Sequence, residues 1–279
     1  MHIQWFPGHM TKALREIENN LNKIDVVIYM LDARAIQSSF NKKFDDLIQN
    51  KKVLYVINKC DLVKSSDLIP WKKKFAESNK ESIFVSSVSS NDKKIILNKI
   101  NIVSKGIVER YKSKGVNKTI RAMVLGMPNT GKSTLINLLA PFKKAVTGNK
   151  AGITRGLQFV KIGEFIELYD TPGTLVPAFE NQEIAIKLAL IGSINDEILD
   201  MNELAVELIK ILKKQNNLEF LERYEQEKYL EDTFEQIEKI AKARGYVLSQ
   251  GKLDCDRCAK ALILELRAGK IGKIMFDFV

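Results

Sequence analysis

The chain has 279 residues, of which 45% are apolar and 28% charged, and its three cysteines are too few for a disulfide framework. This composition excludes disordered and collagen-like chains and leaves room for two globular domains. Apolar runs such as Val26–Leu31 are far shorter than the roughly 18 residues of a membrane span, and the N-terminus lacks the pattern of a secretory signal. We therefore expect a cytoplasmic protein with no membrane partner.

The formal net charge of +10 is unevenly distributed. Residues 1–180 carry 29 Lys and Arg against 16 Asp and Glu, whereas residues 181–279 carry 15 against 18. A basic surface of this size favours a polyanionic partner, nucleic acid before an anionic membrane; the alternative is a solvated, lysine-rich surface. Within the second part, residues 242–273 are basic and could contact a polyanion through Arg257, Lys260, Arg267, Lys270 and Lys273.

Short β-branched runs separated by charged segments of helical length predict a mostly parallel sheet with crossover helices. The predicted strands are Ile24–Leu31, Val53–Ile57, Ile83–Val85 and, after a basic linker at Arg110–Arg121, Ala122–Leu125. An antiparallel pair that turns near Gly163 is predicted at Leu157–Val160 and Phe165–Tyr169.

After about Phe179 the pattern changes to helices. One of them is indicated by the helical spacing of Leu230, Phe234, Ile237 and Ala241, with Gly245 as its C-terminal stop. We therefore expect a sheet domain at residues 1–179 and a smaller all-α domain at residues 180–279.

The segment from Gly126 to Ser133 has the spacing of a complete phosphate-binding loop and lies between a predicted strand and the helical segment Thr134–Leu139. Its glycines allow backbone N–H groups to converge on phosphates, and the helix N-terminus adds positive potential. The candidate nucleotide-binding residues in this segment and at the start of the helical one are Asn129, Thr130, Gly131, Lys132, Ser133 and Thr134. Among them, we expect Lys132 to reach the β- and γ-phosphates and Ser133 to ligate Mg²⁺.

Asp170-Thr171-Pro172-Gly173 follows an apolar segment, which places a carboxylate at a strand end. We expect Asp170 to hold the Mg²⁺ shell through water and the Gly173 N–H to contact the γ-phosphate. Thr154, between these two motifs, supplies a second candidate hydroxyl for Mg²⁺. A plain Pro-Gly turn is the alternative for this tetrapeptide alone, but its combination with the phosphate loop favours a nucleotide site.

Asn58-Lys59-Cys60-Asp61 ends another predicted strand and supplies base selectivity. The Asp61 carboxylate can accept two hydrogen bonds from guanine N1–H and the 2-amino group, which adenine does not offer. Lys59 is expected along the base face, and Asn58 is expected to tie loops together. Backbone N–H groups of Ser86 and Ser87 are candidates for guanine O6, although a plain loop after a strand explains this short motif equally well.

These five elements resemble the translation-factor class of GTPases, but the base motifs precede the phosphate motifs, which reverses the usual order. Because all the loops leave one edge of a parallel sheet, joining the old ends and cutting the chain elsewhere preserves the site. The sequence therefore predicts a circularly permuted P-loop GTPase domain with helices on both faces of the sheet.

Together with these motifs, Trp5-Phe6-Pro7-Gly8-His9-Met10 and Asp32-Ala33-Arg34 resemble the ribosome biogenesis GTPase A family, also called YlqF, over essentially the whole chain. The resemblance implies a GTP-hydrolysing factor that acts late in assembly of the large (50S) ribosomal subunit, binds its RNA and is stimulated by the particle. It implies GTP and GDP as ligands, and we expect a monomer when free.

The resemblance also bears on hydrolysis. The family lacks the usual glutamine after Asp-x-x-Gly and has an apolar residue there, whereas this chain has Thr174. The resemblance points to His9 as the group that positions the attacking water; the alternative is that His9 is structural. The candidate catalytic residues are therefore His9 and, from the phosphate motifs, Lys132, Thr154 and Gly173. Asn129 resembles an asparagine that holds K⁺ in potassium-activated relatives, or it braces the loop.

Two other functional classes remain open from sequence. One is an RNA-binding module in which the nucleotide only stabilises the fold. The other is a metabolic nucleotide enzyme such as a kinase, against which the intact Asn58-Lys59-x-Asp61 motif argues.

Overall fold

A computed structural model describes residues 3, 8–140, 158–162, 164–171 and 181–279; the side chains of residues 8–13, 158, 159 and 250 lie outside this description. A six-stranded sheet has the order β3-β2-β1-β4-β6-β5. Its strands are β1 (Val26–Asp32), β2 (Lys52–Asn58), β3 (Ser82–Phe84), β4 (Ile120–Gly126), β5 (Gln158–Ile162) and β6 (Ile166–Asp170). All neighbours pair in parallel except β5 and β6, which confirms the predicted mostly parallel sheet with its antiparallel pair.

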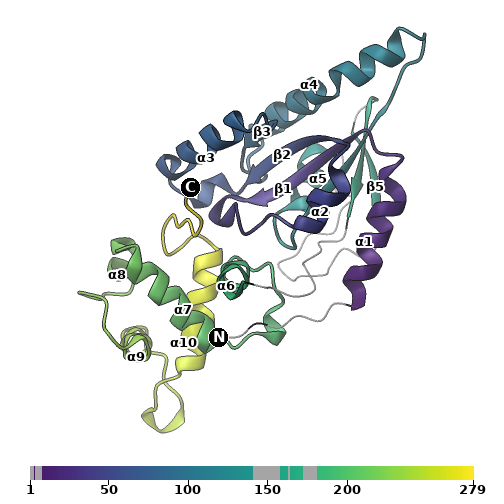
Figure 1. Ribbon diagram of the computed structural model, residues 1–279. Coiled ribbons are helices and arrows are strands. Elements are labelled where there is room, and N and C mark those ends of the chain that lie inside the picture. The colour runs from purple at the N-terminus through teal and green to yellow at the C-terminus, as the bar shows by residue number, and fades with distance from the viewer. Residues whose placement is uncertain (1–2, 4–7, 141–157, 163, 172–180) are drawn as a thin grey trace.

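Helices cover both faces of the sheet, as predicted (Figure 1). On β1, Val26, Ile28 and Met30 join the apolar core beneath α4 and α5, because alternate side chains of a strand point to opposite faces. The intervening Val27 and Tyr29 join the core beneath α1, α2 and α3. The helices are α1 (Gly8–Leu21), α2 (Lys42–Ile48), α3 (Ser65–Glu77), α4 (Asp92–Lys112) and α5 (Lys132–Leu139).

The helical region begins after the sheet, and its apolar core also includes Ile3, Ala35 and Met127 from the first part of the chain. It contains α6 (Gln182–Leu190), α7 (Met201–Lys214), α8 (Leu218–Arg223), α9 (Thr233–Ala243) and α10 (Cys255–Arg267). The predicted domain boundary at Phe179 lies outside the described residues. Among the residues that the structure describes, every helix is too short or too polar to span a bilayer.

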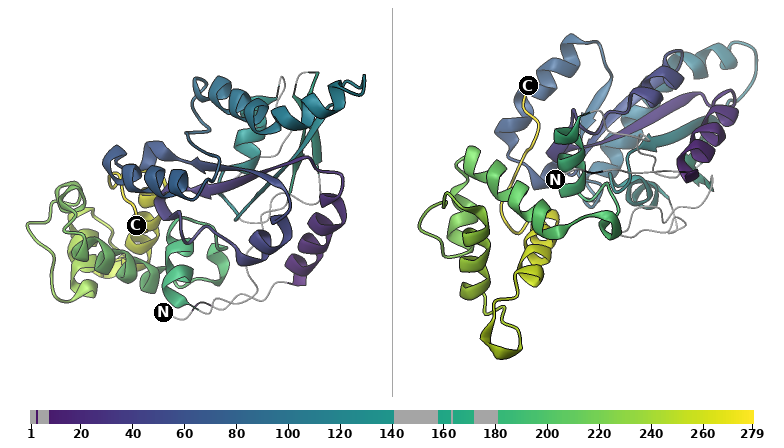
Figure 2. Two further views of the ribbon diagram at one scale, coloured as in Figure 1. Left: turned by 45° about the horizontal axis from the view of Figure 1, so that its top comes forward. Right: turned by 60° about the horizontal axis from the view of Figure 1, so that its bottom comes forward.

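The last residues of the chain return from α10 to the sheet domain and end beside α3 (Figures 1 and 2). Met275 is buried in the same apolar core as β1 and α3. The indole N–H of Trp71 donates to the carbonyl of Asp277 at 3.2 Å, and the amide of Phe276 donates to the carbonyl of Arg34 at 2.6 Å. The sheet domain is therefore completed by residues from the far end of the sequence.

Two local predictions were wrong. The segment predicted as a linker at Arg110–Arg121 begins inside α4, which continues to Lys112. Leu230 precedes α9, because the Asp232 side chain accepts the amide N–H of Phe234 and caps the helix there. The predicted stop is present, since Gly245 follows α9 with a φ of +65°.

Candidate nucleotide-binding site

The motif residues gather at the edge of the sheet where the parallel strands end. Asp32 ends β1 and pairs in register with Asn58, which ends β2. Gly126 ends β4, and Asp170 ends β6 on the next strand along the sheet. Ligands bind at this edge of open α/β sheets, so motifs that are far apart along the chain form one site.

The phosphate loop needs its two glycines. Gly126 has a φ of +154°, and a Cβ there would lie 2.6 Å from the carbonyl oxygen of Met30. Gly131 has a φ of +97°, and a Cβ would collide with the side-chain amide of Asn58. Because Gly131 is also the N-cap of α5, the loop amides lead into the positive end of that helix, as anion binding requires.

Lys132 is 6% exposed, and its ammonium donates to the carbonyls of Met127 at 2.9 Å and Gly126 at 3.2 Å. Burial lowers the pKa of Lys132 to about 8; the nearby Asp170 opposes this shift and Lys59 adds to it. A buried ammonium in a loop of this shape is a suitable counter-charge for phosphate oxygens.

Ser133 and Asp170 meet across the site. The Ser133 hydroxyl donates to Oδ2 of Asp170 at 3.1 Å, and Oδ1 of Asp170 is buried without a hydrogen-bond partner. Burial raises the pKa of Asp170, against the effect of Lys132 and the Ser133 hydrogen bond. Mg²⁺ prefers oxygen ligands and keeps several of its waters. A serine hydroxyl beside a carboxylate with one oxygen that lacks a hydrogen-bond partner therefore fits a hydrated Mg²⁺ ion. Thr171 anchors this strand end by donating to the carbonyl of Val124 at 2.6 Å.

The base motif is hydrogen-bonded to the phosphate loop. Asn58 donates through Nδ2 to the carbonyl of Thr130 at 2.8 Å, and Lys59 donates through Nζ to the carbonyl of Asn129 at 2.5 Å. Lys59 adopts a left-handed conformation with a φ of +63°, which starts the turn containing Asp61. Asp61 is exposed to solvent, where a guanine base can reach its carboxylate.

The structure gives the Ser86-Ser87 loop a different geometry from the one expected. The Ser87 amide donates to Oδ1 of Asn58 at 2.8 Å, and the Ser86 amide donates to Oδ2 of Asp92 at 2.7 Å. Both N–H groups thus hold the loop in place. The next amide along the chain, that of Val88, takes part in neither of these two hydrogen bonds. The Ser87 hydroxyl is buried without a hydrogen-bond partner.

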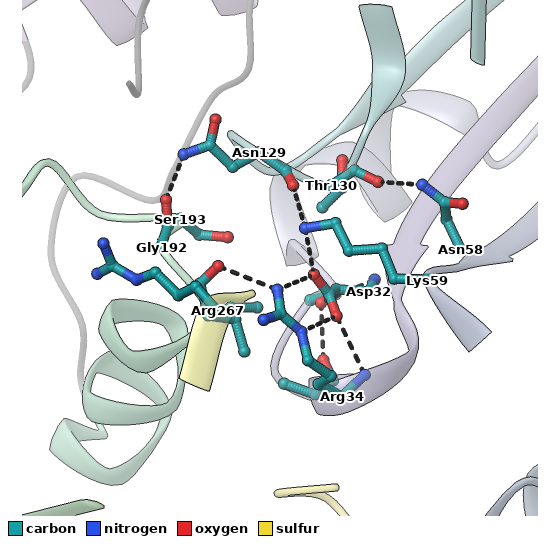
Figure 3. A network of polar contacts seen from close by, with 12 residues as sticks. Asp32, Arg34, Asn58, Lys59, Asn129, Thr130, Gly192, Ser193 and Arg267 are labelled. Carbon is teal, nitrogen blue, oxygen red and sulfur yellow. Dashed lines mark hydrogen bonds and ion pairs between the residues drawn. The ribbon is translucent and has the colours of Figure 1, made fainter. Parts of the chain in front are cut away.

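Sequence reasoning did not assign Asp32 and Arg34 to the site. The Asp32 carboxylate accepts from the Arg34 guanidinium at 2.8 and 2.9 Å and pairs with the Lys59 ammonium at 2.8 Å (Figure 3). Burial alone would raise the pKa of Asp32, but these two cations outweigh it and hold that pKa well below its usual range. The sequence feature that could have identified them is the position of Asp32-Ala33-Arg34 directly after a predicted strand, as for the other site motifs.

Some predicted site residues cannot be placed. The side chain of His9 lies outside the described residues, although its backbone belongs to α1. Thr154, Gly173 and Thr174 also lie outside them. The side chain of Thr134 is partly exposed in the first turn of α5, and that of Asn129 donates to the carbonyl of Gly192 at 2.5 Å.

Known proteins are similar to this chain over nearly its whole length. Ribosome biogenesis GTPase A of Bacillus cereus is 38% identical over 278 residues, which cover 99% of this chain and 94% of the relative. Probable ribosome biogenesis GTPase A of Mycoplasma genitalium is 32% identical over 276 residues, covering 99% and 96%. The chain belongs to the ribosome biogenesis GTPase A family.

A family model described as 50S ribosome-binding GTPase matches residues 121–242 of this ribosome biogenesis GTPase A family member. This match starts at β4 and contains the phosphate loop, whereas the base motif precedes it, consistent with circular permutation. The crystal structure of GNP-bound YlqF from T. maritima is similar over 96% of this chain and 98% of the YlqF chain, with a TM-score of 0.70 and 22% identity. A GDP-bound YlqF structure gives a TM-score of 0.67 at 23% identity, covering 95% and 99%. These structures have the same fold, and the chain is a GTPase.

Proposed function

We propose that this GTPase is an assembly factor of the large (50S) ribosomal subunit, that it binds ribosomal RNA and that the particle stimulates its GTP hydrolysis. The observation that carries the nucleotide part is the direct hydrogen bonding of the base motif to the phosphate loop, Asn58 to Thr130 and Lys59 to Asn129. The ribosomal part is supported by the names of the relatives and of the family model. We also propose that the free protein is monomeric and cytoplasmic.

The phosphate side of the site would hold Mg²⁺·GTP. In this proposal the Lys132 ammonium exchanges its two loop carbonyls for β- and γ-phosphate oxygens, which compensate its buried charge better. Ser133 ligates Mg²⁺ directly, Asp170 holds the metal shell through water, and Thr154 supplies a second hydroxyl. When bound, Mg²⁺ neutralises charge that develops on the phosphate oxygens.

The base side selects guanine through Asp61, while Lys59 lies along the base face. The ion pair between Lys59 and Asp32 fixes the direction of the lysine, and Arg34 fixes Asp32 in turn. In the Ser86-Ser87 loop, the two serine amides are engaged, so we assign guanine O6 to the amide of Val88.

Hydrolysis needs a group that orients the attacking water. We propose that His9 does this, that the Gly173 N–H contacts the γ-phosphate and that Asn129 is a ligand of K⁺. The last assignment requires the Asn129 side chain to present its carbonyl oxygen to the cation, which is compatible with its amide nitrogen donating to Gly192.

RNA contact would use the exposed cations of the basic tail at Lys252–Lys273. Arg257, Lys260, Lys270 and Lys273 are exposed. Arg267 differs, because its guanidinium is paired with Asp196 at 2.7 Å and donates to carbonyls at the end of α6. We therefore exclude Arg267 from the proposed RNA surface.

The decisive experiment measures GTP hydrolysis by the purified chain with and without purified 50S subunits, together with co-sedimentation in GDP and in a non-hydrolysable GTP analogue. We expect stimulation by the particle, tighter association in one nucleotide state, and loss of both effects in Lys132→Ala. GTP binding without stimulation, and equal RNA affinity in both nucleotide states, would instead indicate an RNA-binding module stabilised by nucleotide.

A further inference from the structure

Side chains from outside the phosphate loop hold its backbone carbonyls. Each side chain donates one hydrogen bond to one of three consecutive carbonyls, and the pairs are Ser193 Oγ to Pro128 at 2.8 Å, Lys59 Nζ to Asn129 at 2.5 Å and Asn58 Nδ2 to Thr130 at 2.8 Å. In a trans peptide the carbonyl and the following N–H point in opposite directions. Each held carbonyl therefore fixes the direction of the N–H that follows it, which points away from the donor side chain, and the three amides so fixed include that of Gly131 at the start of α5, where an anion can be bound.

Two of these three donors belong to the base motif, but Ser193 belongs to the helical region. It lies in the turn that follows α6 and is 1% exposed. The preceding residue of that turn, Gly192, accepts a hydrogen bond from the side chain of Asn129 (Figure 3). The side chain of Met127, at the start of the loop, is buried in the apolar core of the helical region. The loop thus contacts the helical region in three ways: through the backbone carbonyl of Pro128, the polar side chain of Asn129 and the apolar side chain of Met127.

The turn that carries Ser193 is itself firmly held. The guanidinium of Arg267 donates to the carbonyls of Ala189 at 2.7 Å and Leu190 at 3.1 Å, at the end of α6. The next carbonyl, that of Ile191, accepts from Arg34 at 3.1 Å, so cations neutralise the negative end of the helix. Arg267 also pairs with Asp196 beyond the turn. The hydroxyl of Ser193 is therefore presented to the loop from a rigid support.

We propose that Ser193 is a positioning residue for the phosphate loop, and that the turn after α6 keeps this loop in its anion-binding conformation. The inference rests on the proposed function, since it assumes that the loop binds the diphosphate of GDP and GTP. Asn129, next to the contacted Pro128, has a φ of +59°, a left-handed conformation that is uncommon outside glycine although asparagine tolerates it best, and the contacts of the loop help to hold it. Removing the Ser193 hydroxyl removes one such constraint, and a less ordered loop binds phosphate less tightly.

The coupling must also run in the opposite direction. If the turn favours the loop conformation that binds nucleotide, binding of nucleotide must stabilise the turn by the same free energy. The helical region is therefore sensitive to whether the loop is loaded, through Gly192 and Ser193.

The test compares Ser193→Ala with Ser104→Ala in the full chain. Ser104 is an equally buried serine, 1% exposed, whose hydroxyl donates to the carbonyl of Ile100 within α4, away from the loop. Release of N-methylanthraniloyl-GDP is followed by fluorescence after addition of excess GDP, and melting temperatures are recorded for all proteins. We expect Ser193→Ala to release the nucleotide about five-fold faster than the wild type, as the loss of one hydrogen bond predicts, and Ser104→Ala to release it at the wild-type rate.

A second pair covers the case in which Ser193→Ala does not fold. Arg267→Gln removes the support of the turn, and its control Arg223→Gln breaks the ion pair of Arg223 with Glu265 elsewhere in the helical region. Faster release in Arg267→Gln alone supports the proposal. If the wild type binds GDP and each variant releases it at the same rate as its control, the proposal is overturned. A wild type that does not bind GDP contradicts the proposed function itself.

Discussion

At the scale of single residues, the site depends on charges that are buried before any ligand arrives. Lys132, Asp170 and Asp32 are each almost fully buried, and each has a shifted pKa. Asp32 is already neutralised by Arg34 and Lys59. Lys132 and Asp170 instead face the place where phosphate and metal would lie, so ligands complete their compensation.

The lowered pKa of Lys132 predicts a pH dependence of nucleotide affinity. The pKa is about 8 in the free protein, and bound phosphates must raise it. Binding therefore takes up a proton above about pH 8, and GDP affinity should fall as the pH rises through that value while staying constant below it. Isothermal titration between pH 6.5 and 9.5 measures this, with guanosine as the control ligand because it has the base but no phosphate. A GDP affinity that follows that of guanosine at every pH would contradict the assignment.

Asp61 predicts the base preference. Asn in its place presents an amide donor to the 2-oxo group of xanthine, so Asp61→Asn should prefer xanthosine diphosphate to GDP. Competition against a fluorescent guanine nucleotide measures the preference. The control is Asp67→Asn, which changes a partly exposed aspartate in the first turn of α3 and should keep the wild-type preference for guanine. If both variants still select GDP, the base is read elsewhere.

The limits of sequence reasoning are visible in the same residues. Roles for Lys132, Ser133 and Asp61 could be proposed from sequence because their motifs have fixed spacing and known chemistry. Arg34 could not, because of its partners only Asp32 is a neighbour in sequence, whereas Ile191 and Phe276 come from distant parts of the chain and reach it through the fold. The serine amides at 86 and 87 were assigned to the base because the competing acceptors, Asn58 and Asp92, were not recognisable in sequence.

At the scale of elements, the strands at the centre of the sheet were predictable because they are largely apolar runs buried on both faces, as every position of β1 is. Ends were less predictable. α4 extends three residues into the expected linker, since Ile96, Ile100 and Ser104 bury one face of it and Gly115, with a φ of +74°, comes only after Lys112. The start of α9 was set by a cap at Asp232 and not by the apolar spacing that had included Leu230.

The chain end is an element that the sequence did not predict, and it makes a stability prediction. Met275 is 1% exposed and lies in the core shared by β1 and α3. Met275→Ala should therefore lower the free energy of unfolding by about 2–5 kcal/mol, as buried methionine truncations do. Urea denaturation measures it. The control Phe278→Ala removes a larger side chain that is 62% exposed and should change stability by less than about 0.5 kcal/mol.

Deletion of the helical region after Phe179 would remove Met275 together with the partners of Trp71 and Arg34. Such a truncation would therefore damage the sheet domain as well. Equal stability losses in the two chain-end variants would contradict this conclusion, because they would show that the residues of the tail contribute no buried contact to the sheet domain.

At the scale of the whole molecule, the proposed binding to the ribosome predicts a dependence on salt concentration. Neutralising phosphates releases counterions, so binding to 50S particles or their RNA should weaken steeply with salt. Combined Lys260→Ala, Lys270→Ala and Lys273→Ala should lower the affinity and reduce the slope of log affinity against log salt by about one for each phosphate that is no longer neutralised. Residues 219–239 carry eight acids against three bases, so substituting their exposed lysines Lys228 and Lys239 provides the control. An unchanged slope in the triple variant would place the RNA surface elsewhere.

The two histidines of the chain both lie near its N-terminus, and only His9 is expected to act in hydrolysis. The position after Gly173 that a glutamine usually occupies is Thr174, which cannot orient water as an amide does. An imidazole titrates near neutral pH and can hold or polarise a water. His9→Ala should therefore lower 50S-stimulated GTP hydrolysis by about 10²-fold with little change in GTP binding, while His2→Ala should change neither. Single-turnover hydrolysis and equilibrium binding, measured on the same preparations, separate the possible roles. Unchanged stimulated turnover would make His9 structural, and a parallel loss of binding would make it a folding residue.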